Sequence, residues 1–196
     1  MRRLRRSELP HDTVELARFL IGKLLVRDTD EGRTVGRIVE TEAYLVGDAA
    51  AHSFRGLTPR NKSLFLERGH AYVYFIYGCW FALNVSSEVA GTGAGCLLRA
   101  IEPVEGLDIM KQRRGTDRLL DLARGPGRLA TAMAIDRSLD GSDLCARGPL
   151  WLARGGVARP VIGESIRIGI TREVDRLLRF YARGSPFVSG PKRLQQ

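Results

Sequence analysis

The order of apolar and polar residues predicts short strands interrupted by a few helices. A helix is expected between a capping box, Asp12 with Glu15, and Gly22, because apolar residues recur there at helical spacing. Two extended apolar runs follow at residues 24–27 and 37–44, with a polar turn between them. These runs predict two strands of one hairpin.

A second hairpin is expected near the middle of the chain. Residues 71–77 and 80–86 have the composition of strands and flank Gly78. A further apolar run at 96–101 is expected to end at Pro103. The remaining expected elements are helices at 61–68, 104–114 and 128–134 and strands at 150–152, 166–170 and 178–181.

The sequence as a whole predicts one domain. It has no internal repeat, no low-complexity tract and no linker that would divide it, so we expect a single domain over residues 1–196. Strands separated by few helices favour a mixed α+β fold over a parallel doubly wound one. Residues 1–10 begin with a run of arginines and are expected to form a flexible basic N-terminus.

The net charge adds nucleic acid as an expected partner. The hydrophobic and charged fractions, 44% and 27%, are ordinary, whereas a net charge of +9 and a pI near 10.1 are not. Such an excess attracts polyanions, with nucleic acid first and an anionic membrane surface second. A charge that serves only solubility is the alternative.

Cysteines and histidines give no sign of a metal site or cofactor. Cys79, Cys96 and Cys145 do not form a disulfide framework, and they are not spaced with the three histidines as zinc ligands. No apolar run of a secretory signal follows the basic N-terminus. The longest uncharged run, residues 71–87, falls short of the roughly 20 residues of a membrane span. We expect a cytoplasmic protein that does not enter a membrane.

The strand expected at 37–44 carries the candidate chemistry. Its alternation places Glu40, Glu42 and Tyr44 on one face. Paired carboxylates on a strand are usually solvated or paired with arginine, but the apolar flanks here indicate partial desolvation. Desolvation raises a carboxylate pKa and suits the group to proton transfer. Glu42, nearer the following loop, is the better catalytic candidate, and Glu40 is expected to have a structural partner.

Aromatic residues and a histidine follow this strand. His52 lies in a long loop at 45–60, where a lone histidine can carry a proton, contact a ligand or do neither. Tyr72 and Tyr74 share a strand face and either pack in the core or stack on bases. Tyr77, at an exposed turn, could wedge between base pairs.

Two polar residues in apolar strands complete the candidate set. Asn84 needs hydrogen-bond partners if it is buried, and Arg99 is expected to pair with a carboxylate, Glu42 being the attractive choice. A carboxylate, aromatic rings and an imidazole in a strongly basic protein favour hydrolytic chemistry on a nucleobase or nucleotide.

Several short motifs occur in one order along nearly the whole chain: ARFLIGKLLV (17–26), IVETEAY (38–44), AHS (51–53), TPRN (58–61), YVYFIYG (72–78), NV (84–85), LLRAIEP (97–103), GPGRL (125–129), RIGI (167–170) and RFY (179–181). Together they resemble the monofunctional 3-methyladenine (alkyladenine) DNA glycosylases of the mammalian type. One such motif would be weak, but their common order is highly specific. The resemblance implies a single mixed domain with a curved antiparallel β-sheet and flanking helices, and no metal.

The resemblance also implies roles for individual residues. Glu42 matches the general base that activates water. Arg99 and the backbone of Ile168 match groups that help to place that water. Tyr77 matches the residue inserted into the DNA minor groove, and Asn84 matches the asparagine that disfavours guanine. The residues that match those around the flipped base are Tyr44, His52 and Tyr74.

The expected enzyme is therefore a DNA glycosylase of base excision repair. It would flip alkylated or deaminated purines from double-stranded DNA and hydrolyse the N-glycosidic bond, acting as a monomer at the nucleoid of a bacterium or in a eukaryotic nucleus. Two other classes stay open at this point. One is a non-catalytic nucleic-acid-binding domain, and the other is a hydrolase of free nucleosides.

Overall fold

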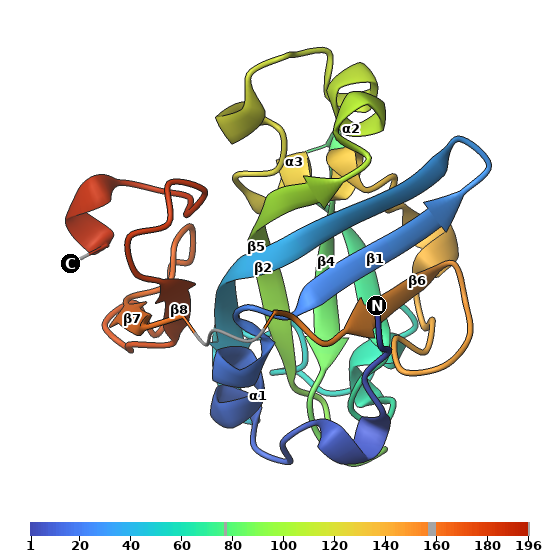
Figure 1. Ribbon diagram of the computed structural model, residues 1–196. Coiled ribbons are helices and arrows are strands. Elements are labelled where there is room, and N and C mark those ends of the chain that lie inside the picture. The colour runs from blue at the N-terminus through green and yellow to red at the C-terminus, as the bar shows by residue number, and fades with distance from the viewer. Residues whose placement is uncertain (77, 157–159, 196) are drawn as a thin grey trace.

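A single long strand, β2 (Gly32–Tyr44), organises the computed structural model, which describes residues 1–76, 78–156 and 160–195. One edge of β2 pairs with β5 (Gly95–Glu105). The other edge pairs first with β1 (Leu24–Thr29) and then with β8 (Arg179–Ala182), and all these pairings are antiparallel. The strand therefore links two halves of the sheet (Figure 1).

The sheet extends from β2 in both directions. Beyond β5 come β4 (Trp80–Ser86) and β3 (Ala71–Ile76), while β6 (Leu150–Ala153) pairs with β1 and β7 (Ile162–Ser165) pairs with β8. Register shifts in the β2–β5 ladder, one beside Gly36 and two around Glu40, bend the strands as β-bulges do. The predicted α+β domain with a curved antiparallel sheet is confirmed.

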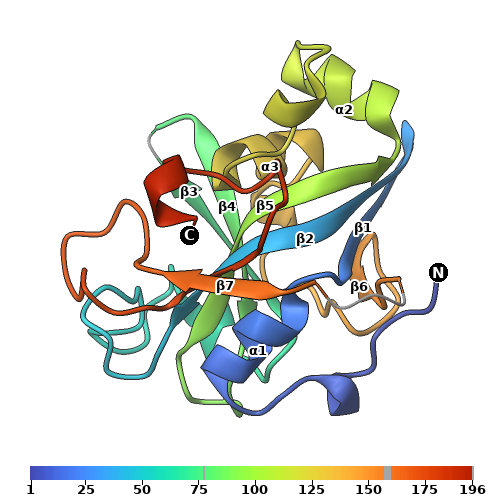
Figure 2. The same cartoon turned by 60° about the vertical axis from the view of Figure 1, so that its left-hand side comes forward.

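Helices lie at two ends of the sheet (Figures 1 and 2). Helix α1 (Thr13–Leu20) packs against β2, α3 (Pro126–Ala132) packs against β4 and β5, and α2 (Leu107–Arg114) packs against α3. Short 3-10 turns are found at Arg6–Glu8, Lys62–Phe65, Leu119–Asp121, Arg137–Leu139 and Lys192–Leu194. In the part of the chain that the structure describes, no helix has the length and apolar character needed to cross a bilayer.

Helix α1 begins at its predicted cap and fixes one side of the long strand. The Asp12 side chain accepts a hydrogen bond from the backbone N–H of Glu15 at 2.9 Å. Leu16 and Leu20 are fully buried in the core. The Thr41 hydroxyl, also buried, donates to the Ala17 carbonyl at 2.9 Å. This bond ties α1 to the part of β2 that carries the two carboxylates.

The prediction of a strand at 166–170 is wrong, because strand β7 ends at Ser165, just before this segment. The Ile168 N–H, which a strand would use in a ladder, donates instead to the Glu42 carboxylate at 2.7 Å. Gly169 has a φ of +80°, outside the extended region. Apolar alternation alone could not reveal that a side chain claims this backbone donor.

Three expected helices also differ from the prediction, and the one expected at 61–68 is only the 3-10 turn Lys62–Phe65. Strand β5 continues through Pro103, which lies opposite Gly36 at a register shift, where a residue without an N–H is tolerated. The helix expected at 104–114 therefore begins only at Leu107, after Gly106. The helix expected at 128–134 begins two residues earlier, because Pro126 suits a first helical turn, and ends at Ala132.

The first ten residues, for which we expected a flexible tail, pack on the domain. Leu4 and Leu9 are buried at 1% and 2% exposure, and the Leu4 N–H donates to the Leu152 carbonyl at 2.9 Å. Arg6 pairs with Asp143 at 2.6 Å. The two leucines, Leu4 between arginines and Leu9 between Glu8 and Pro10, provide the apolar contacts that dock this segment.

The glycines that flank α2 provide a test of this packing. Gly106 and Gly115 both have positive φ, +74° and +62°. A Cβ on Gly106 would lie 2.3 Å from the Arg33 carbonyl oxygen, whereas a Cβ on Gly115 would meet nothing within 4 Å. We expect Gly106→Ala to lower the free energy of unfolding by about 2–4 kcal/mol and Gly115→Ala by about 1 kcal/mol. Urea unfolding measures both, and equal losses would contradict the packing.

Candidate active site

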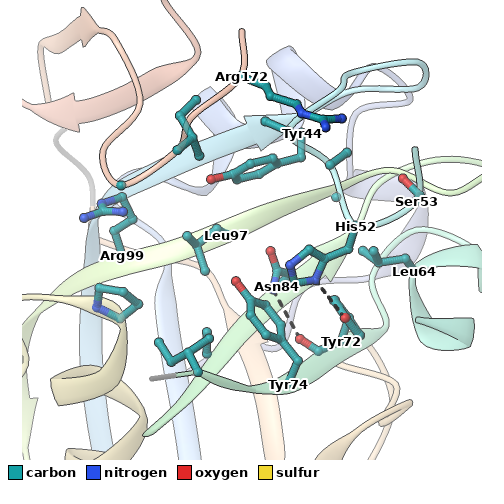
Figure 3. A pocket seen from close by; sticks show the side chains of 18 of the residues that line it. Tyr44, His52, Ser53, Leu64, Tyr72, Tyr74, Asn84, Leu97, Arg99 and Arg172 are labelled. Carbon is teal, nitrogen blue, oxygen red and sulfur yellow. Dashed lines mark hydrogen bonds between the residues drawn. The ribbon is translucent and has the colours of Figure 1, made fainter. Parts of the chain in front are cut away.

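A cavity of about 540 Å³ opens where β2 ends, between the following loop and strands β3, β4 and β5 (Figure 3). This volume suits a small organic ligand. The residues at 168–172 and the start of α3 close its remaining sides. The candidate residues from the sequence that line it are Tyr44, His52, Tyr74, Asn84, Arg99 and Ile168.

Glu42 lies directly behind the cavity wall and is completely buried. Its Oε1 accepts the Ile168 N–H at 2.7 Å and lies 3.2 Å from Arg99 Nη1, and its Oε2 accepts the Tyr44 hydroxyl at 2.9 Å. All three partners line the cavity. The predicted Arg99–Glu42 pair is confirmed. Because a carboxylate offers about four acceptor positions, these contacts leave room for a further donor such as water.

Burial dominates the electrostatics of this group. It raises the pKa of Glu42, while the nearby Arg99 charge and the bonds from Ile168 and Tyr44 act in the opposite direction. Burial and the adjacent Glu42 also raise the pKa of Tyr44, so its hydroxyl stays protonated and donates. Burial disfavours the Arg99 charge, but Glu42 and Glu40 outweigh it and raise the pKa of that guanidinium.

Aromatic rings form the wall opposite Tyr44 (Figure 3). Tyr72 and Tyr74, which share a face of β3 as predicted, stack with ring centroids 5.2 Å apart. His52 meets Tyr74 edge-on at 4.4 Å, and its Nδ1 hydrogen-bonds with the Tyr72 hydroxyl at 2.9 Å. Burial, with the Arg60 charge, lowers the pKa of His52 and favours a neutral ring. The sequence left open whether Tyr72 contributes to a site. In the structure the Tyr72 hydroxyl holds the ring of His52, so Tyr72 supports the site.

Asn84 lies at the inner end of the cavity and is nearly buried at 6% exposure. Its Nδ2 donates to the Tyr72 carbonyl at 3.4 Å, which meets the expectation that a buried amide has a partner. Asn84 pairs with Tyr72 on one side and with Leu97 on the other, so three strands fix its position.

Glu40 has the structural partners that we expected for it. It is fully buried, and its Oε1 accepts from Arg179 Nε at 2.6 Å and from Arg99 Nε at 3.1 Å. Its Oε2 accepts the Ser189 N–H at 2.7 Å. Glu40 thereby holds a segment near the C-terminus against the back of the site.

Sequence reasoning missed a buried ion pair between two cavity walls. Arg167 and Asp48 are both fully buried and form a bidentate pair. The Arg167 guanidinium also donates to the Ala43 carbonyl at 3.0 Å and lies 4.6 Å from the centre of the Tyr44 ring. An arginine between two isoleucines was the available signal, but it fitted an alternating strand equally well. The pair fixes the ring that faces the cavity.

A second missed residue, Asn61, closes the loop that bears His52. Its Nδ2 donates to the carbonyls of His52 and Gly56 at 2.9 and 3.0 Å, and its Oδ1 accepts the Thr58 N–H at 2.7 Å. Asn61 is 3% exposed. The Asn61 side chain thus binds the backbone at residues 52, 56 and 58 and connects the part of the loop that bears His52.

Tyr77, predicted to insert into DNA, lies outside the described residues. Within residues 1–76, 78–156 and 160–195, no group of three or more His, Cys, Asp or Glu side chains is arranged to hold a metal ion.

Comparison with known proteins identifies the family. The sequence model of the methylpurine-DNA glycosylase family matches residues 7–186. A candidate 3-methyladenine DNA glycosylase of Mesorhizobium japonicum is 68% identical over 191 residues, which are 97% of this chain and 92% of that protein. The human DNA-3-methyladenine glycosylase is 44% identical over 200 residues, 93% of this chain and 66% of the human protein.

These similarities confirm the resemblance seen in the ordered sequence motifs. The family match covers most of the chain, and the relatives align along nearly all of it. The chain therefore belongs to the methylpurine-DNA glycosylase family and is a DNA glycosylase.

Proposed function

We propose that the enzyme takes an alkylated or deaminated purine, such as 3-methyladenine or hypoxanthine, from duplex DNA into this cavity and hydrolyses its N-glycosidic bond. Glu42 acts as the general base for the attacking water. The observation that carries the proposal is the placement of this buried carboxylate behind three cavity-lining partners, Tyr44, Arg99 and Ile168.

The aromatic walls are suited to a planar base. A purine between Tyr44 and the Tyr74–His52 wall would stack on π-faces, and stacking of this kind is worth roughly 1–3 kcal/mol per base. A methylated base such as 3-methyladenine is cationic, which adds cation–π attraction. Asn84 at the inner end would crowd the exocyclic amine of guanine and so protect the normal base.

The bond cleavage requires a negative charge beside the sugar. As the C1′–N bond breaks, the sugar acquires oxocarbenium character, as in glycoside hydrolysis. The ionised Glu42 stabilises this charge and takes a proton from the water that adds to C1′. Arg99 and the Ile168 N–H hold the carboxylate in one orientation, with Oε2 able to accept from water as well as from Tyr44.

The damaged purine must leave the DNA helix before its glycosidic bond can be cleaved in the cavity. Extrusion costs a few kcal/mol, and less for a damaged or mispaired base, which contributes to selectivity. In this proposal Tyr77 fills the gap, and the net charge of +9 attracts the phosphate backbone. The enzyme works as a monomer where chromosomal DNA lies, at a bacterial nucleoid or in a eukaryotic nucleus.

The role of Glu42 is tested by Glu42→Gln, which keeps the shape of the side chain and removes its charge. We expect excision of 3-methyladenine and hypoxanthine from duplex DNA to slow by about 10²–10⁴-fold, the usual contribution of a general base. Binding to lesion-containing duplex should persist. Single-turnover base release and DNA-binding titrations measure the two properties.

Glu102→Gln is the matched control, because Glu102 is a half-exposed carboxylate on the neighbouring strand that pairs with Arg37 at 3.1 Å. It should excise at the wild-type rate. Undiminished excision by Glu42→Gln would overturn the proposed base. A nucleoside hydrolase, by contrast, would cleave free nucleosides and would not respond to Tyr77→Ala.

The pH dependence follows from the burial of Glu42. The Glu42 carboxylate must be ionised to act as the general base, so activity is lost as the pH falls through the pKa of Glu42. Because burial raises the pKa of Glu42 above the ordinary 4.5, the acid limb for 3-methyladenine release should lie above that pH. Rates measured between pH 4 and 8, with circular dichroism to monitor folding, test this. A rate that stays constant down to pH 4.5 would exclude it.

Salt dependence tests the contact with the phosphate backbone. Each phosphate contact is expected to contribute about −0.9 to the slope of log affinity against log salt concentration. The affinity for a lesion-free duplex should therefore fall steeply between low and physiological salt. A nearly flat response, measured by fluorescence anisotropy, would contradict an electrostatic DNA-binding surface.

A further inference from the structure

One guanidinium serves two buried carboxylates. Arg99 Nε lies 3.1 Å from Glu40 Oε1, and Arg99 Nη1 lies 3.2 Å from Glu42 Oε1. Both glutamates are fully buried, and Arg99 is 7% exposed. Any change that draws this arginine toward one carboxylate weakens its hold on the other.

Glu40 also pairs with a second cation, Arg179, whose Nε lies 2.6 Å from Glu40 Oε1. Among the described residues, no hydrogen bond or ion pair joins Arg179 to Glu42. Arg179 is fully buried and also donates to Ser165 Oγ at 2.6 Å, the Ser189 carbonyl at 2.9 Å and the Leu194 carbonyl at 2.8 Å. These bonds hold the Arg179 charge in place. The result is a row of ion pairs, Arg179–Glu40–Arg99–Glu42, in which Arg99 is the guanidinium that both carboxylates share.

We propose that Glu40 is a positioning residue that, by sharing Arg99 with Glu42, limits how strongly this guanidinium stabilises the Glu42 carboxylate. Arg179 supports this division, because it supplies Glu40 with a charge partner of its own. The inference rests on the proposed role of Glu42 as the base. It explains why a structural carboxylate stands two residues before the one proposed to accept the proton.

The chemical benefit is a base of sufficient strength. A carboxylate held by an undivided Arg99, with no second anion nearby, would keep its negative charge but accept a proton from water less readily. Glu40 acts on Glu42 both through Arg99 and through its own negative charge, and both effects work in the same direction.

The other charged groups on the elements around the two carboxylates have partners of their own. Helix α1 carries Arg18, which pairs with Glu164 at 2.9 Å and lies over the Phe180 ring. Arg167, behind Tyr44, is neutralised by Asp48. The groups that face Glu40 and Glu42 directly are Arg99 from β5, Arg179 from β8 and the Tyr44 hydroxyl from β2.

Two substitutions should therefore shift the acid limb of 3-methyladenine release in opposite directions. Glu40→Gln frees Arg99 for Glu42 and removes an anion, so the limb should move to lower pH by about one pH unit. Arg179→Met removes a cation and draws Arg99 toward Glu40, so the limb should move to higher pH by about the same amount. A purely structural role would move neither.

The experiment measures single-turnover release of 3-methyladenine from methylated duplex DNA against pH for both variants. Arg179→Lys, which keeps the charge, should restore the wild-type limb, and Glu102→Gln should leave it unchanged. Circular dichroism at each pH restricts the comparison to folded protein. If one variant does not fold, the direction of the other still decides the question.

The outcomes separate the two proposals. Opposite shifts, with activity abolished in Glu42→Gln, support Glu40 as the positioning residue that acts on Glu42 through Arg99 and through its own charge. A wild-type acid limb in every folded variant, with Glu42→Gln inactive, would overturn the role of Glu40 and leave Glu42 as the base. An acid limb that persists in an active Glu42→Gln enzyme would overturn the proposed function itself.

Discussion

The structure depends on a set of buried charges placed where its longest strand bends. Glu40 and Glu42 have no solvent-exposed surface, and Arg99 and Arg179 are almost equally buried. Such an arrangement is stable only while every member keeps its partner, since leaving a buried charge unpaired costs about 3–5 kcal/mol. The backbone helps to meet this requirement at Glu40. Register shifts of β2 lie on both sides of this residue, and the Ser189 N–H donates to its Oε2. The fold and the site are thus held by the same contacts.

The same contacts determine how the cavity is built. The Ile168 N–H binds Glu42 and the neighbouring Arg167 packs on Tyr44, so one short segment orients both the carboxylate and the ring. Asp48 connects that segment to the loop bearing His52. Buried hydrogen bonds and an ion pair thereby join the loop segments of the site to one another and to β2. Fixed placement of the carboxylate is what the proposed general-base chemistry requires.

Local patterns in the sequence predicted a large part of this arrangement. Alternation along β2 placed Glu42 and Tyr44 on one face, and their 2.9 Å hydrogen bond agrees. Apolar neighbours around Arg99 indicated a buried arginine that needs a carboxylate. What the sequence could not indicate depended on contacts between distant residues. The Ile168 N–H is used by a side chain 126 residues away, and Leu4 is buried by a strand near residue 152.

The central claim is that Glu42 directs water to the sugar of a nucleotide held in this cavity. A crystal structure of Glu42→Gln bound to a duplex containing hypoxanthine tests it most directly. The account predicts an uncleaved nucleotide with its base between Tyr44 and Tyr74 and a water between residue 42 and C1′. A base seated outside the cavity, or a sugar turned away from residue 42, would contradict it.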